Sequence, residues 1–278
     1  MKQQFINDLQ ETAWKRMSMI GHDCENWQAG DWLNAVLGEV GEAANIVKKH
    51  LRGDEFDFRQ HLGAELADVL SYLVILCEFS GIKLERKNIA EDECIWPYQG
   101  LSNASLGCAM AFNDLTYTYL IGMSTTEKDI ENDKQKRGLA ASLLLQRVEG
   151  LAELAGVDLT MATAEKFNQV TARIADLPAS VDDLYLKFDS FKFKIENDLL
   201  YISGIMYGEE HPYISISRYD EFQFEVPRWN LLHYSNRIFE KMSIKSREEL
   251  TAGQLEKELQ KLPMLNKARY KIYHPQTH

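Results

Sequence analysis

Two pairs of carboxylates stand out between residues 38 and 84: Glu39 with Glu42, and Glu65 with Asp68. The members of each pair are three residues apart, so on a helix each pair would point two carboxylates the same way. Both pairs lie in otherwise apolar helical patterns, where like charges resist ionisation unless a cation neutralises them. Mg²⁺ prefers oxygen ligands and keeps part of its coordination sphere for water and phosphate. Neither pair has the histidine of a di-iron bundle site. The sequence therefore predicts that these four acids hold Mg²⁺.

The segment around these acids reads GEVGEAANIVKK and then ELADVLSYLVILCEFSGIKL. It resembles the MazG-like nucleotide pyrophosphohydrolases, which belong to the all-α NTP pyrophosphatase superfamily with the dimeric dUTPases and the dCTP pyrophosphatases. A single helical ExxE is usually a solvated face, so the resemblance depends on both pairs and their flanks. It implies a mainly α fold with a four-helix-bundle unit. It also implies a Mg²⁺-dependent enzyme, with Mn²⁺ as a substitute, that converts a nucleoside triphosphate and water into a monophosphate and diphosphate, with a dNTP favoured.

The resemblance also implies roles for residues outside the acid pairs. Glu39 is the candidate general base that takes a proton from the attacking water. The substrate-binding candidates are Trp32 and Asn34 for the nucleoside, Lys48 for phosphate, and Lys166 and Asn168, which belong to a KFN pattern in GVDLTMATAEKFNQVTARI. Each has an ordinary alternative: Trp32 as a core residue, Lys48 as a partner of the helix macrodipole, and the last two as a solvated helix face.

An internal similarity links residues 63–84 to residues 138–159 at a shift of 75 residues, with six identities. The acids are lost at this shift, since Glu65 falls on Ala140 and Asp68 on Leu143. We interpret this as a tandem pair, one half active and one degenerate, which supplies within one chain the partner that single-domain family members obtain by dimerising. The alternative is a chance likeness of two amphipathic helices that end in glycine. Whether two chains associate as a homodimer is left open.

This predicts three domains. Residues 1–99 form a MazG-like catalytic helical unit, residues 100–179 a degenerate second helical repeat that completes the bundle, and residues 180–278 a small α+β domain of unknown role. Helices are expected over 3–19, 31–50 and 62–79, with loops at 53–60 and 124–137. Beyond residue 180 the hydrophobic period changes to two, which predicts strands at 191–195, 213–217 and 222–226 and a hairpin turn at 196–198. Helices are expected at 230–242 and 252–262.

The net charge of −11 makes general binding of nucleic acid or of an anionic membrane unfavourable. The sequence contains no run of 18 or more apolar residues, so no membrane span is expected. The four cysteines show no CxxC pairing and the first residues lack the apolar core of a secretory signal, so we expect a reduced, cytoplasmic setting.

Two other functions fit the same sequence. The chain could bind metal and nucleotide without turnover and signal through its C-terminal domain. Alternatively, the region after residue 179 could be the working part, with the helical unit as a scaffold. The base and sugar of the substrate are not fixed by the sequence.

Overall fold

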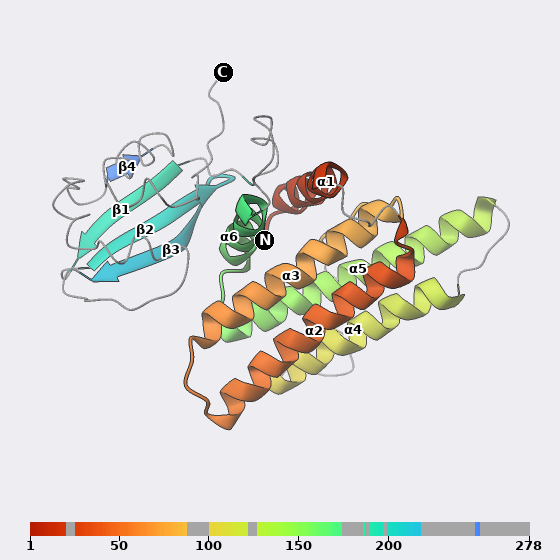
Figure 1. Ribbon diagram of the computed structural model, residues 1–278, viewed down its shortest axis with the longest axis horizontal. Coiled ribbons are helices and arrows are strands. Elements are labelled where there is room, and N and C mark those ends of the chain that lie inside the picture. The colour runs from red at the N-terminus through yellow and green to blue at the C-terminus, as the bar shows by residue number, and fades with distance from the viewer. Residues whose placement is uncertain are drawn as a thin grey trace, which may run out of the picture. The chain divides into compact units, whose positions relative to one another are not determined.

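The computed structural model of the 278-residue chain describes residues 1–20, 26–87, 100–121, 127–173, 186, 190–196, 199–217 and 248–250. These residues are mainly helical (Figure 1). The chain divides into two compact units, Met1–Phe167 and Asn168–His278. The helices are α1 (Gln3–Ile20), α2 (Ala29–Arg52), α3 (Phe58–Phe79), α4 (Leu101–Ile121), α5 (Glu127–Ala155) and α6 (Leu159–Arg173). Among the described helices, none is long and apolar enough to span a bilayer.

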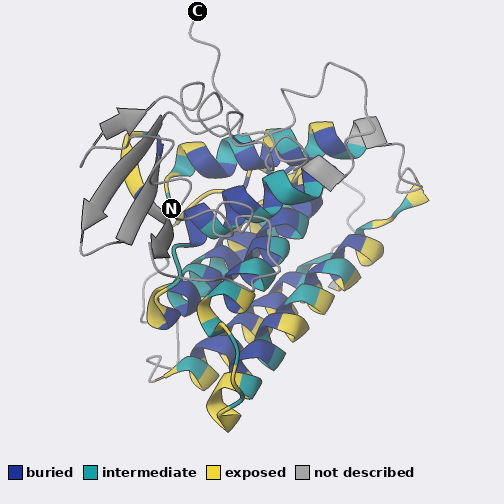
Figure 2. Ribbon diagram, turned by 60° about the vertical axis from the view of Figure 1, so that its left-hand side comes forward, coloured by how far each residue is buried: buried dark blue, intermediate teal, exposed yellow. Residues whose placement is uncertain are grey.

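Helices α2 to α5 lie side by side in the first unit (Figure 1). Helix α2 packs along α3 and α4 packs along α5, and the two hairpins meet through contacts of α2 with α4 and of α3 with α5. Helix α3 is apolar almost all round, as expected of a helix with neighbours on several sides. The faces turned toward the neighbours are buried and the outer faces are exposed (Figure 2).

The contacts between the two hairpins are reciprocal at the shift of 75 residues. A Cβ placed on Gly63 would lie 3.2 Å from Val157 Cγ1, and a Cβ placed on Gly138 would lie 3.5 Å from Ile82 Cγ2. Each residue of the second contact stands 75 positions from its counterpart in the first.

The ends of α3 and α5 show the same reciprocity. Gly81 and Gly156 both have a left-handed backbone, with φ of 63° and 66°. In each case the next residue donates its backbone N–H to the carbonyl five residues back, from Ile82 to Cys77 and from Val157 to Ala152, both at 2.8 Å. These are the left-handed caps that glycine favours.

A basic side chain from the opposite hairpin lies at each of these helix ends. A Cβ placed on Gly156 would lie 3.3 Å from Arg59 Nη2, and one on Gly81 would lie 3.5 Å from Lys134 Nζ. A cation at a helix C-terminus is favoured by the macrodipole. Arg59 and Lys134 are again 75 positions apart, so each of the two aligned segments has a cation near its helix end.

Several expected boundaries are wrong. Asp31 was expected to cap α2, but the helix begins two residues earlier, and the Asp31 carboxylate accepts a hydrogen bond from the Gln28 backbone at 2.8 Å. Helix α3 begins at Phe58 rather than 62, because Asp57 caps it by accepting from the Gln60 N–H at 3.1 Å.

The expected loop over residues 124–137 is also wrong where the structure describes it, since α5 begins at Glu127. Its first turns are rich in glutamate and lysine, which have good helix propensity, and their polarity alone did not mark a loop. The expected helix over 3–19 is confirmed within one residue by α1.

The second unit contains an antiparallel sheet in the order β3-β2-β1-β4. Its strands are β1 (Ser190–Glu196), β2 (Leu199–Met206), β3 (Glu209–Ser217) and β4 (Glu248–Leu250). Strands β2 and β3 join through Tyr207 and Gly208, both with positive φ, as in a tight hairpin turn. Pro212 lies on the edge strand β3 beside a break in the register, one of the few places where a sheet tolerates proline.

The predicted strand at 191–195 is confirmed by β1, and that at 213–217 by the second half of β3. The predicted strand at 222–226, the turn residues 197–198 and the helices at 230–242 and 252–262 lie outside the described residues. Strand β4 was not expected, because three residues are too few to show an alternating pattern.

Candidate metal centre

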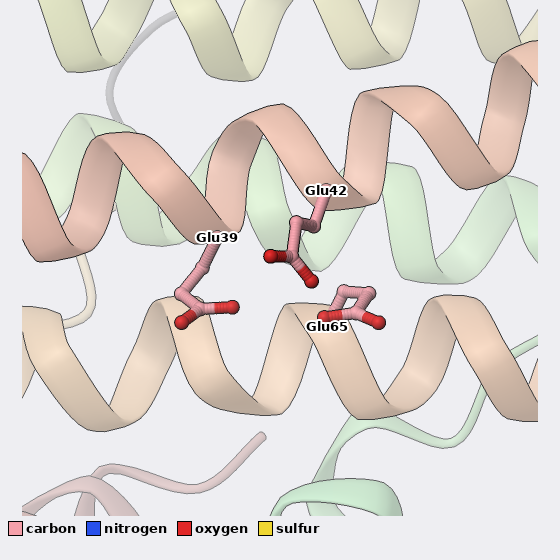
Figure 3. Close-up of side chains that lie close together, drawn as sticks. All are labelled: Glu39, Glu42 and Glu65. Carbon is pink, nitrogen blue, oxygen red and sulfur yellow. The ribbon is translucent and has the colours of Figure 1, made fainter.

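Helix α2 presents the first acid pair. Apolar residues at helical spacing bury one face of α2, among them Val36, Val40 and Ala43. Glu39 and Glu42 lie beside this face, and their carboxylates point toward α3 (Figure 3). The helix ends at Gly53, whose φ of 88° provides a left-handed cap.

Helix α3, which packs along α2, carries the second pair. Leu62, Leu66 and Leu70 hold it in the core, and Glu65 and Asp68 occupy positions between these anchors. Both acids are half-buried. Placing them on a helix that is buried nearly all round fixes their backbone before any ligand arrives.

Three of the four acids converge. One carboxylate oxygen from each of Glu39, Glu42 and Glu65 lies within 4.8 Å of the others. Figure 3 shows the three carboxylates facing one another across the space between α2 and α3. We call these three residues the acidic trio. The i, i+3 spacing thus predicted the shared face of α2 correctly.

The electrostatics of the trio reflect a shortage of positive charge. Burial is the largest cause that raises the pKa of Glu39 to about 7, and the charges of the three neighbouring acids add to it. Burial also raises the pKa of Glu65, with the Glu42 charge next in importance. A bound cation would stabilise the ionised form of these carboxylates and so lower their pKa values.

Asp68 does not join the trio. Its Oδ2 accepts a charge-assisted hydrogen bond from Lys166 Nζ at 2.7 Å. Burial raises the pKa of Asp68, although Lys166 and Arg16 both act in the opposite direction. The described structure thus brings three of the four predicted acids within 4.8 Å of one another and pairs the fourth, Asp68, with a lysine from α6. The sequence placed Lys166 near the substrate, but it gave no sign of this ion pair.

Arg16 is the residue that the sequence reasoning missed. Its side chain is only 8% exposed, it donates from Nη1 to the Phe167 carbonyl at 3.0 Å, and its guanidinium lies 3.8 Å from the centre of the Phe167 ring. Desolvation lowers the pKa of Arg16 to about 10, while the charge of Asp68 opposes the shift. An arginine on the apolar face of an amphipathic helix was the available signal, since such residues are rarely buried unless paired.

Trp32 is a core residue in the described structure. Its side chain is 2% exposed, and its ring centre lies 4.5 Å from that of the half-buried Trp27 at a tilt of 55°. Among the described residues, its indole N–H finds no hydrogen-bond acceptor. The two rings form an aromatic pair at the start of α2, two helical turns before Glu39, and Trp27 is the member with an accessible surface.

The other substrate-binding candidates are placed differently. Asn34 and Lys48 are exposed on α2, and the pKa of Asp54 after this helix is lowered mainly by its hydrogen bond with Arg52, with a smaller contribution from Lys48. Asn168 belongs to the second unit, where its Nδ2 donates to the Leu186 carbonyl and its Oδ1 accepts from the Leu186 N–H, both at 2.9 Å. The structure therefore gives Asn168 a role in holding the chain after α6.

The donor set of the trio fits a hard divalent cation. It offers carboxylate oxygens alone, on two helices that are fixed by packing, with one side of the trio open through the exposed Glu42. Mg²⁺ and Mn²⁺ favour such oxygen ligands, and an incomplete protein shell leaves positions for water and phosphate.

No protein-family model, no curated protein and no solved structure matches the chain.

Proposed function

We propose that the protein is a Mg²⁺-dependent nucleoside triphosphate pyrophosphohydrolase, which converts a (d)NTP and water into a (d)NMP and diphosphate, with a dNTP as the favoured substrate. The observation that carries the proposal is the convergence of three carboxylates between α2 and α3. The resemblance of the surrounding segment to the MazG-like enzymes supports the reaction class. The reciprocal contacts at the 75-residue shift support a tandem repeat of which one half keeps the acids.

The trio would hold the cation. When bound, the cation neutralises polyphosphate charge and makes a water more acidic. Glu39 is the candidate general base, because its carboxylate lies in the trio beside the position where the cation would hold the attacking water. Its carboxylate would accept the proton of the attacking water. No covalent intermediate is needed, because water attacks a phosphorus atom and diphosphate leaves with the bridging oxygen.

The remaining residues would hold the nucleotide. Lys166 lies beside Asp68, close enough for its charge to act on Glu39 and Glu65 as well, and is the described cation best placed for phosphate. The pair Trp27 and Trp32 would provide the surface for the nucleobase, with Asn34 two residues after Trp32 on α2. Lys48 is a less favoured phosphate ligand than Lys166, because it lies toward the C-terminal end of α2.

The test is a panel of the canonical NTPs and dNTPs, assayed with and without Mg²⁺ for both products. With Mg²⁺ we expect nucleoside monophosphate and diphosphate in equal amounts. Without Mg²⁺ we expect neither product. Glu39→Gln should lower kcat by at least about a hundredfold, the usual contribution of a general base. Glu153→Gln, an equal charge change at an exposed position of α5, is the matched control.

The products separate the proposal from its rivals. If no nucleotide of the panel releases diphosphate but nucleotides still bind in the presence of Mg²⁺, the protein is a non-catalytic nucleotide-binding protein. Release of inorganic phosphate and a nucleoside diphosphate would contradict the proposed position of cleavage.

A further inference from the structure

The ion pair between Lys166 and Asp68 divides the four acids into two groups. Lys166 Nζ lies 2.7 Å from Asp68 Oδ2, and the two side chains are 25% and 20% exposed. The acidic trio, by contrast, has mutual oxygen distances within 4.8 Å and no ion pair with a described residue. An ammonium group therefore pairs directly with Asp68, whereas no described cation lies within ion-pair distance of the trio.

The charge of Lys166 extends beyond Asp68. It also opposes the rise in pKa of Glu39 and of Glu65, so a single ammonium acts on three of the four acids. The Lys166 ammonium therefore lies near both Asp68 and the acidic trio. A divalent cation that used Asp68 as a ligand would have to displace the ammonium from it.

The backbone that carries Lys166 is fixed by its neighbours. Phe167, the next residue, is buried, its carbonyl accepts from Arg16 at 3.0 Å, and its ring packs under the Arg16 guanidinium at 3.8 Å. Helix α1 thus anchors α6 one residue from Lys166. The ammonium is placed by this packing, whereas an exposed lysine would sample many directions.

We propose that Lys166 is a resident counter-ion that takes the place of a second divalent cation, so that the protein without nucleotide binds one such ion, at the acidic trio. This rests on the metal site of the proposed function. It deepens that proposal, because it assigns Asp68 to the lysine and not to the metal in the resting protein. A second ion could enter beside Asp68 only after Lys166 has moved, for example toward a bound polyphosphate.

The experiment is a titration of the full chain with Mn²⁺ alone, with free Mn²⁺ followed by electron paramagnetic resonance and heat by calorimetry. The wild-type protein should bind one ion. Lys166→Gln should bind two, and its first ion should bind about tenfold more tightly, since a nearby repelling charge is gone. Lys166→Arg keeps the cation and should bind one ion.

Two controls separate this effect from general electrostatics and from misfolding. Lys83→Gln removes the same charge from an exposed position after α3 and should leave one ion with unchanged affinity. Lys166→Met retains most of the aliphatic stem, so it replaces Lys166→Gln if that variant fails to fold. Adding Asp68→Asn to the Lys166→Gln variant should return the number of bound ions to one.

The outcomes distinguish the inference from the function on which it rests. One ion bound to Lys166→Gln with wild-type affinity, or two ions bound to the wild-type protein, would overturn the role of Lys166 and leave the metal site intact. No Mn²⁺ bound by either protein would contradict the metal site, and the role of Lys166 with it.

Discussion

Glu39 shows at the scale of one residue how the site depends on a cation. Its carboxylate lies half-buried among three other acids, and its pKa is raised to about 7, with burial as the largest cause. A glutamate in this position is partly protonated at neutral pH in the metal-free protein. Metal binding must therefore release a proton, and the apparent affinity for Mg²⁺ should increase as the pH rises through 7.

The raised pKa of Glu39 also predicts how the stability of the metal-free protein depends on pH. The stabilising contribution is fully present below the unfolded-state value near 4.5 and is lost as the pH rises through about 7. Between pH 5 and pH 8 in EDTA, the wild-type protein should lose about 1 kcal/mol of unfolding free energy relative to Glu39→Gln, a value reduced for the partial exposure of the side chain.

Urea denaturation of both proteins at the two pH values provides the measurement. Glu153→Gln should follow the wild-type protein, because its position is exposed. Equal pH dependence of the wild-type and Glu39→Gln proteins would mean that Glu39 is not under the electrostatic strain described above.

At the scale of the elements, the sequence predicted the helices that carry the four acids but not the ion pair that connects α3 to α6. Residue spacing identified the shared face of Glu39 and Glu42, and glycine identified the ends of α3 and α5, because these signals are local. The partner of Asp68 could not be predicted in the same way. Lys166 lies on a helix far along the chain, and only packing decides which of several lysines reaches an acid.

The reciprocal contacts of the two hairpins lead to a matched pair of substitutions. A Cβ on Gly63 would lie 3.1 Å from Ala162 Cβ and 3.2 Å from Val157 Cγ1, whereas a Cβ on Gly138 would meet nothing closer than Ile82 Cγ2 at 3.5 Å. Gly63→Ala should therefore destabilise the protein by about 1–3 kcal/mol through overpacking. Gly138→Ala should be neutral or stabilise by up to about 1 kcal/mol, since alanine favours a helix.

Urea denaturation of the two variants tests this packing directly. The same substitution at two helical glycines 75 positions apart makes each variant the control for the other. An equal loss of stability in both would show that the close approach at Gly63 is not as described.

At the scale of the whole molecule, all the described residues of the candidate site except Asn168 belong to the first unit, Met1–Phe167. Sequence patterns predicted a mainly helical first part and a strand-containing second part, because the hydrophobic period changes from 3.6 to 2 near residue 190. They did not predict the division after Phe167, which falls within α6. A boundary inside a continuous helix leaves no local signal of turn residues.

This division predicts the behaviour of a chain that ends at residue 179. It retains all of α6, including Lys166, and should keep Mn²⁺ binding and most of the diphosphate release, with some fraying after Asn168 because the contacts with Leu186 are lost. Circular dichroism would show whether the shortened chain is folded, and product analysis would measure its activity. A folded, metal-binding chain without activity would place part of the working site after residue 179.

The most direct measurement of the central claim is a crystal structure with Mn²⁺ and a non-hydrolysable dNTP analogue, with anomalous diffraction used to locate the metal. The account predicts an anomalous peak within about 2.3 Å of oxygens from Glu39, Glu42 and Glu65, with the phosphates of the analogue on the open side of the ion. No peak at this position, with the three carboxylates pointing away from one another, would contradict it.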